Sequence, residues 1–169
     1  HAHAGRRLLA LLMFSPAPEA QAPGAAAVYT VTYAEVLPTA GGTVVNAFRQ
    51  YRDASRKEDG FVRFDLREQI GRPGLYTIVE AWRDQQTFDA HAAAAHTRLY
   101  QEALRPLRVA GYDQRPYKPL AVAPPRTASR QSVHVLAHVD IGNQAQLNAP
   151  AMLTKFAETS RAEPGNLQF

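Results

Sequence analysis

Apolar residues follow two different patterns along this chain, one typical of strands and one typical of helices. Residues 28–36 (VYTVTYAEV) alternate and are rich in β-branched and aromatic side chains, which predicts a strand. After Pro38 and a pair of glycines, apolar residues recur at helical spacing over residues 44–55, with charged residues opposite them. This second pattern predicts an amphipathic helix.

Two further strands are expected after this helix, which ends at Asp59-Gly60. In residues 61–68 (FVRFDLRE) the apolar and charged side chains alternate, which predicts a half-buried strand. Its apolar side is expected to consist of Val62, Phe64 and Leu66, and its charged side of Arg63, Asp65 and Arg67. A glycine-rich turn over residues 71–74 then leads into a third strand over residues 75–82, antiparallel to the second.

The last part of the pattern predicts a second helical region and a final strand. Asp84 is a suitable N-cap for a helix over residues 85–94, and a further helical piece over residues 97–104 stops before Pro106. A strand over residues 109–117 is a weaker prediction, because it contains Gly111 and Pro116. The order β-α-β-β-α-β predicts a ferredoxin-like α+β fold, an antiparallel sheet with its helices on one face.

The N-terminus has a different pattern. Two arginines precede the short apolar run 8–14, and small residues follow up to Ala22. This is the pattern of a secretory signal peptide over residues 1–22, so the protein is expected to be exported, to the periplasm. The apolar run is too short to span a bilayer, and no stable membrane anchor is expected.

The C-terminal part repeats the opening pattern at an offset of 105 positions. Residues 55–60 (SRKEDG) fall on residues 160–165 (SRAEPG), and residues 29–36 fall on residues 134–141. We therefore expect a first domain over residues 23–120, a Pro/Ser-rich linker over residues 121–132, and a truncated second repeat over residues 133–169.

Composition narrows the possible functions. The chain has no cysteine, which excludes thiol nucleophiles and Cys-ligated metal sites. Its net charge is +4, but the basic residues are scattered among acidic ones, so no nucleic-acid partner is expected. RNA-recognition domains share this element order, with Tyr29, Tyr33 and Phe64 as the candidates for base stacking. The absence of a basic face and the expected export argue against that alternative.

Candidate chemistry is concentrated at the end of the third strand and in the following helix. Glu80 and Trp82 are close in sequence to His91 and His96, and imidazole titrates near neutral pH. In one unbroken helix, histidines five residues apart lie on different sides, so no metal site is expected.

These residues resemble a known family. Glu58-Asp-Gly60 before a strand, then Glu80-x-Trp82, then His91 and His96 resemble the antibiotic biosynthesis monooxygenase (ABM) domain. The resemblance covers residues 28–120 fully and residues 133–169 as a truncated second copy. It implies a dimeric α/β barrel in which two sheets face each other. Some members are quinol or anthrone monooxygenases that use O2 without metal or flavin, others degrade haem, and others are isomerases.

The resemblance implies cofactor-independent oxygenation of a small aromatic or quinol compound, with O2 as co-substrate. His91 and His96 are then the candidate catalytic acid and base, and substrate binding is expected from Trp82, Glu80, Tyr76 and Tyr29. Haem degraders of this family carry an Asn, a Trp and a His that this chain replaces with Thr and Tyr residues on the first strand, with His91, and with Gln101. Haem is therefore disfavoured as a cofactor.

Two alternatives remain open at this stage. One is a non-catalytic exported module that binds aromatic compounds or haem, because such a module would need the same pocket without a working histidine. The other concerns assembly. The sheet is expected to pair with a second sheet, either in a homodimer or in a pseudo-dimer between the two repeats of one chain.

Overall fold

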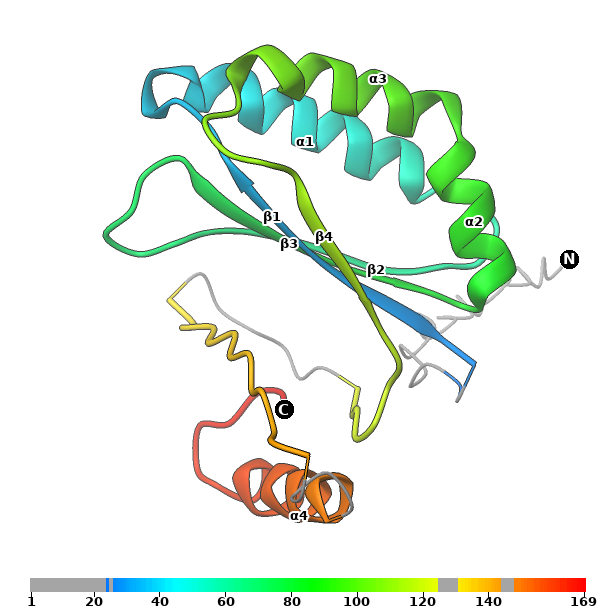
Figure 1. Cartoon of the computed structure of the whole chain (residues 1–169), viewed down its shortest axis with the longest axis vertical. Helices are drawn as coiled ribbons and strands as arrows, with labels where there is room; N and C mark the ends of the chain where they lie inside the picture. The colour runs from blue at the N-terminus through cyan, green and yellow to red at the C-terminus, as the bar shows by residue number, and fades with distance from the viewer. Residues whose placement is uncertain (1–23, 25, 125–130, 144–147) are drawn as a thin grey trace, which may run out of the picture.

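The computed structural model describes residues 24, 26–124, 131–143 and 148–169. One antiparallel sheet has the strand order β2-β3-β1-β4, and three helices cover one of its faces (Figure 1). The elements are β1 Val28–Glu35, α1 Gly41–Ser55, β2 Phe61–Glu68, β3 Leu75–Trp82, α2 Gln85–Ala93, α3 Ala95–Leu104, β4 Asp113–Tyr117 and α4 Ala149–Arg161. The predicted ferredoxin-like α+β fold is confirmed.

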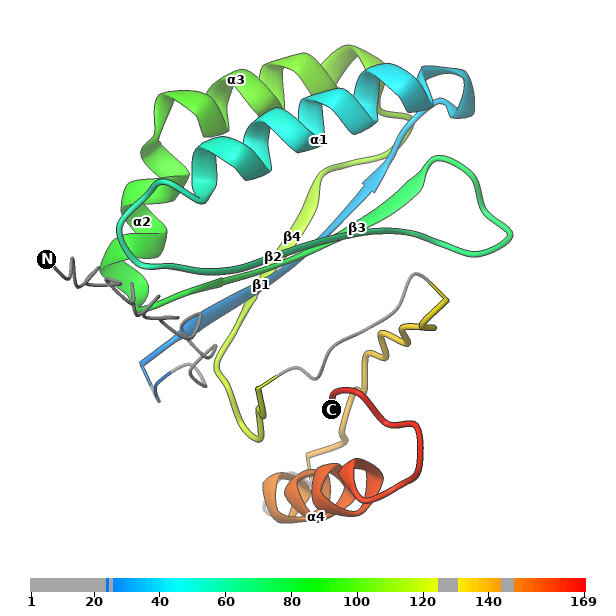
Figure 2. The same ribbon diagram turned by 180° about the vertical axis from the view of Figure 1, so that it is seen from behind.

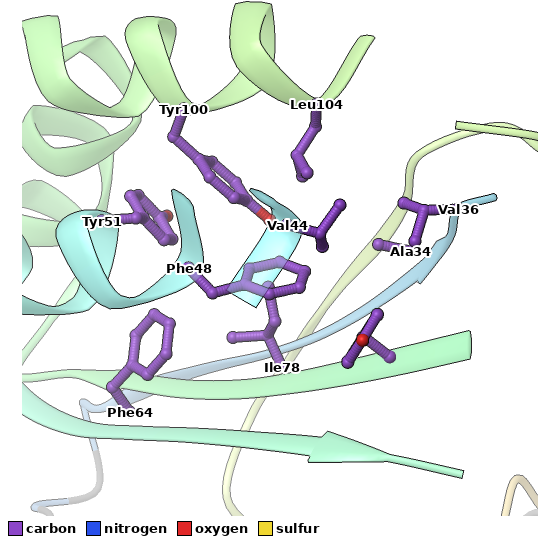
Figure 3. Close-up of a cluster of buried hydrophobic side chains, with 10 residues drawn as sticks. Ala34, Val36, Val44, Phe48, Tyr51, Phe64, Ile78, Tyr100 and Leu104 are labelled. Carbon is purple, nitrogen blue, oxygen red and sulfur yellow. The ribbon is translucent and has the colours of Figure 1, made fainter. Parts of the chain in front are cut away.

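The core lies between the sheet and the helices. Along β1 every second residue is buried, because successive side chains of a strand point to opposite faces. In Figure 3, side chains of α1 and α3 meet side chains of the sheet. Phe48 of α1 contacts Tyr76 edge to face, with ring centroids 5.2 Å apart, and Tyr51 stacks on Tyr100 at 4.1 Å. Helices α1, α2 and α3 leave the opposite face of the sheet uncovered, and this face is called the open face below.

One side chain of β2 lies on a different face from that predicted. Phe61 pairs with Trp82 and Arg63 pairs with Ala81, so Val62 has no partner of its own. This bulge reverses the alternation at its position, and Val62 is 38% exposed. The prediction of Val62 on the apolar side is wrong, whereas Phe64 is buried as expected.

The second helical region is interrupted where the sequence predicted. The Asp84 side chain accepts a hydrogen bond from the Thr87 backbone N–H, and the Thr87 hydroxyl accepts one from the Asp84 backbone N–H. This capping box starts α2. At Ala94 the backbone becomes extended (ψ 149°), which ends α2 and starts α3.

The last strand of the sheet is short. The structure assigns β4 to five residues that include Pro116, and it forms the edge of the sheet beside β1. The strand predicted over residues 109–117 therefore exists only in its second half.

The C-terminal part of the chain lies on the open face of the sheet. Figures 1 and 2 both show α4 on the side opposite to α1, α2 and α3. Residues 132–142, aligned by the repeat with the first strand, form no strand. No described strand lies beside them to pair with their backbone, which explains the difference from β1. The expected signal peptide over residues 1–22 falls outside the described residues. None of the described helices is long and apolar enough to cross a membrane.

The β2–β3 turn offers a matched pair of glycines for testing the fold. Gly71 and Gly74 both have positive φ, 76° and 89°. A Cβ on Gly74 would lie 2.5 Å from the backbone oxygen of Val36, whereas a Cβ on Gly71 would meet nothing within 4 Å. We expect Gly74→Ala to lower the free energy of unfolding by ~3 kcal/mol or more, and Gly71→Ala by ~1 kcal/mol. Urea denaturation measures both, and equal losses would contradict the close approach.

Candidate active site

Three elements, β3, α2 and α3, bring the candidate residues together. Glu80 and Trp82 lie on β3 and point toward the helices, because both occupy the buried side of that strand. His91 lies near the end of α2, and the break at Ala94 turns the chain so that His96, at the start of α3, lies next to it. The two imidazole centroids are 5.5 Å apart.

His91 is the centre of the cluster, and both of its ring nitrogens have partners. Nδ1 lies 2.6 Å from Glu58 Oε2, and Nε2 lies 2.6 Å from the Tyr51 hydroxyl. The ring also stacks on the Trp82 indole, with centroids 4.1 Å apart. A neutral imidazole satisfies this arrangement when Nδ1–H donates to Glu58 and Tyr51 donates to Nε2. The result is a continuous chain from phenol through imidazole to carboxylate.

The electrostatics favour the neutral form of this chain. Burial lowers the pKa of His91, and the Glu58 carboxylate opposes that change. Burial also raises the pKa of Tyr51 far above its usual range, so this phenol keeps its proton. Tyr51 can therefore donate a hydrogen bond but cannot serve as a base.

Glu80 is the most unusual titratable group of the cluster. The residue is 1% exposed, its Oε2 accepts a hydrogen bond from the Thr30 hydroxyl at 3.2 Å, and its Oε1 has no hydrogen-bond partner among the described residues. Oε1 lies 3.6 Å from His91 Nε2. Burial raises the pKa of Glu80 to about 7, although the hydrogen bond from Thr30 opposes the rise. A carboxyl group in this state can accept or release a proton near neutral pH.

A buried donor lies on the same side of β3. The indole Nε1 of Trp82 has no hydrogen-bond partner among the described residues, and the side chain is fully buried. An acceptor on Glu80 and a donor on Trp82, two residues apart on one strand face, are both unsatisfied. Buried polar groups are nearly always hydrogen-bonded. Among the described residues, four further buried atoms, on Thr32, His96, Tyr100 and Arg108, are unsatisfied in the same way, and a polar ligand that reached the pair on β3 could satisfy both of its atoms.

The cluster is closed toward the core and more open at its rim. Glu80 and Trp82 are inaccessible, whereas the side chains of Glu58 and His96 are 22% and 26% exposed. His96 Nε2 lies 3.2 Å from Glu58 Oε2, so Glu58 contacts both imidazoles. Glu58 and His96 therefore form the rim of the cluster, although the Nε2 atom of His96 is itself buried.

Glu58, His91 and His96 could also hold a metal ion. Their ligand atoms lie within 4.8 Å of one another. The geometric reason for excluding a metal was wrong, because the break at Ala94 brings the two histidines together. The short contacts of both histidines with Glu58 already account for this arrangement, and we assign no metal to it.

Two of the predicted substrate-binding residues lie elsewhere. Tyr76 is six residues from Trp82 along β3, about 20 Å away at strand spacing, and packs into the core against Phe48. Tyr29 points to the open face of the sheet. There it lines a cavity of about 330 Å³ with Tyr117 and Phe169. The structure thus groups Glu80, Trp82, His91 and His96, and separates Tyr76 and Tyr29 from them.

Sequence reasoning missed three members of the cluster. Tyr51 lies in the segment predicted only as an amphipathic helix, and Thr30 in the segment predicted as the first strand. Glu58 stood in the Glu-Asp-Gly turn before β2, and that turn was itself part of the family pattern. The motif therefore carried a signal for Glu58, whereas Tyr51 and Thr30 reach the cluster through contacts distant in sequence.

Comparisons with known proteins agree with this fold. Residues 27–103 match the family model described as antibiotic biosynthesis monooxygenase. A putative antibiotic biosynthesis monooxygenase from Nitrosomonas europaea is 21% identical, with a TM-score of 0.55, covering 59% of this chain and 96% of that one. A conserved protein from Methanosarcina mazei is 19% identical, with a TM-score of 0.54, covering 56% and 93%.

A third structure, a putative antibiotic biosynthesis monooxygenase from Caulobacter crescentus, is 14% identical, with a TM-score of 0.54, covering 56% of this chain and 90% of that one. No curated protein matches the chain. At these identities the structural likeness shows a common fold.

Proposed function

We propose, from the premise that residues 27–103 form an antibiotic biosynthesis monooxygenase domain, that the protein oxygenates a small aromatic or quinol-type compound with O2 and without a cofactor. The observation that supports this proposal is the unsatisfied pair formed by Glu80 Oε1 and Trp82 Nε1. A flat substrate with an acidic C–H or O–H group and a ring oxygen would satisfy both. Glu80 would accept the proton, and the indole N–H would donate to the oxygen that gains negative charge.

For an anthrone-type substrate the reaction balances without a metal or flavin. Transfer of one proton from the ring CH2 group to Glu80 leaves an electron-rich anion that gives an electron to O2. Recombination of the two radicals forms a carbon–oxygen bond, and the peroxide takes the proton back. Loss of water then gives the ketone, so that CH2 and O2 become C=O and H2O. The protein supplies the base, the oxyanion donor and a site without bulk water.

The histidines act beside the base in this proposal. His91 has no free nitrogen to face a substrate, because Tyr51 and Glu58 occupy both. We assign it to holding Tyr51 against Glu80 and to conducting protons toward Glu58. His96 at the rim would exchange those protons with solvent.

Access to the buried pair requires the α2–α3 segment to move, since Glu80 and Trp82 are covered in this structure. The break at Ala94 is the natural place for that movement. Such a movement would have to break the hydrogen bond that the Thr97 hydroxyl donates across the break to the backbone oxygen of His91, at 2.7 Å.

The second candidate function is a non-catalytic module that binds aromatic compounds. The cavity on the open face favours it, because Tyr29, Tyr117 and Phe169 give that cavity an apolar and aromatic lining. Export through a signal peptide at residues 1–22 is proposed for either function, and rests on the sequence pattern alone. The tandem repeat and the pairing of the sheet with a second unit likewise belong to the proposal.

Oxygen uptake separates the two candidates. The purified full chain, treated with chelator, is expected to consume O2 saturably with anthrones or hydroquinones. Binding of the same compounds without O2 uptake, by protein shown to be folded, would favour the binding module and contradict the oxygenase.

The rim histidine gives a finer prediction. His96→Ala is expected to lower the rate by ~10-fold or more with little effect on stability, because proton exchange with solvent becomes slower. Added imidazole should restore part of the rate in His96→Ala and leave the wild type unchanged. An unchanged rate in His96→Ala would remove His96 from the proton path.

A further inference from the structure

The end of α4 and its following turn reproduce the end of α1 at an offset of 105 residues. Three backbone hydrogen bonds join residues 57 to 54, 58 to 55 and 61 to 58, and three equivalent bonds join 162 to 159, 163 to 160 and 166 to 163. Each turn then uses a glycine with positive φ, 79° at Gly60 and 88° at Gly165. Ser55 and Ser160 are both buried. The sequence offset therefore corresponds to a local structural repeat.

The same offset relates residues that touch across the open face of the sheet. The Tyr33 hydroxyl lies 2.6 Å from His138 Nε2, and Arg63 donates a hydrogen bond to Gln168 Oε1 at 2.7 Å. Each pair is separated by 105 residues. In an arrangement with a twofold axis, a residue close to the axis contacts its own equivalent. A twofold relation predicts contacts of this kind. Two unrelated contacts would be expected to have different sequence separations.

We infer that residues 131–143 and 148–169 lie on the open face of the sheet as part of a second copy of the fold, related to the first by a pseudo-twofold axis near the Tyr33–His138 and Arg63–Gln168 contacts. The occupant of this surface is the chain's own C-terminal segment and not a second chain. Figures 1 and 2 show this segment facing the sheet from the side that no other helix covers.

Contacts of the segment agree with this placement. His138 lies between two tyrosines of the sheet, because its Nδ1 is also 3.2 Å from the Tyr117 hydroxyl. Arg161 donates to the backbone oxygens of Ala121 and Phe169, at 2.6 and 3.1 Å, which ties α4 to the end of the first domain. A tether of few residues raises the effective concentration of the segment to the millimolar range. A free second chain must compete with that concentration for the same face.

Thiol crosslinking tests the inference directly, because the natural chain has no cysteine. Two double variants, Tyr33→Cys/His138→Cys and Arg63→Cys/Gln168→Cys, are treated with a short bismaleimide. We expect both to crosslink within one chain, with the same yield after tenfold dilution. A matched control, Arg98→Cys/His138→Cys, is expected to give no product, since Arg98 lies on α3 on the other side of the sheet.

The single variant Tyr33→Cys decides which occupant the face has. If a second copy occupied it, the twofold axis would bring the introduced thiols of two chains together and give a covalent dimer. We expect the monomer to remain. A covalent dimer as the main product of Tyr33→Cys, or failure of either double variant to crosslink within the chain, would overturn the inference. Each variant removes only one of the two contacts, and circular dichroism checks that it is folded.

Discussion

Replacing Glu80 with Gln is expected to reduce the rate of the proposed oxygenation by ~10²–10⁴-fold, the usual contribution of a general base. The amide keeps the shape of the side chain and can still accept a hydrogen bond from Thr30, so binding of substrate should change little. Oxygen uptake at saturating substrate measures the loss. A rate within threefold of the wild type would show that Glu80 is not the base.

The pH dependence gives this prediction a second readout. Glu80 must be ionised to accept a proton, and burial raises its pKa to about 7. The wild-type rate should therefore rise with pH and level off above about 7, and the residual rate of Glu80→Gln should lack that rise. Glu35→Gln is the matched control, because Glu35 lies on the opposite face of the sheet in an ion pair with Arg72.

Glu80→Gln should lower the rate, but above neutral pH it should raise the stability of the folded protein. The folded pKa of Glu80 is about 7, above the ordinary value of 4.5, so the folded state holds this proton more tightly than the unfolded state. The wild type is then expected to lose stability as pH rises from 4.5 to 7, by about 3 kcal/mol at 1.36 kcal/mol per pKa unit. Glu80→Gln avoids this loss and should be more stable than the wild type at pH 8 but not at pH 4.5. Equal pH dependence in both proteins would contradict the buried, neutral state of Glu80.

Replacing His91 with Ala is expected to be the most damaging single change to the folded state in this cluster. The residue is 2% exposed, and its removal opens a cavity beside Trp82. It also leaves the buried Tyr51 hydroxyl without its partner. Together these effects should lower the free energy of unfolding by about 3 kcal/mol. Urea denaturation can be followed through Trp82, which is the chain's single tryptophan.

His96→Ala serves as the control for that measurement. It removes an imidazole from the same carboxylate, but the side chain is 26% exposed, against 2% for His91. Its loss of stability should stay below ~1 kcal/mol. If both variants lost the same amount, the stacking on Trp82 and the bond to Tyr51 would not contribute as the geometry indicates.

The sequence predicted those features of the fold that depend on neighbouring residues. Alternation identified β1 and β2, and Asp84 identified the start of α2. The sequence pattern placed Val62 on the wrong face. A bulge arises from the pairing of two strands, and it cannot be seen in the alternation of residues within one strand. The sequence pattern also predicted strand-like structure over residues 134–141, where no neighbouring described strand supports it.

The candidate site was predicted in part for the same reason. Glu80, Trp82, His91 and His96 belong to one short stretch of sequence, so their proximity followed from the elements alone. Tyr51 and Glu58 join them across 40 and 33 residues through contacts to His91. Such contacts depend on how α1 packs against α2 and α3. The local spacing of apolar and polar residues does not reveal that packing. The pKa of Glu80 depends on that packing too.

The short strand β4 has a consequence for the behaviour of the protein at high concentration. A long, exposed edge strand invites the edge of another molecule to add to it, which is how sheets grow into fibrils. Here that edge is five residues long and contains Pro116, whose backbone has no N–H to offer. A proline in such a position resists strand-by-strand polymerisation. The protein should therefore resist fibril growth from the β4 edge of its sheet, even where other exposed apolar residues favour aggregation.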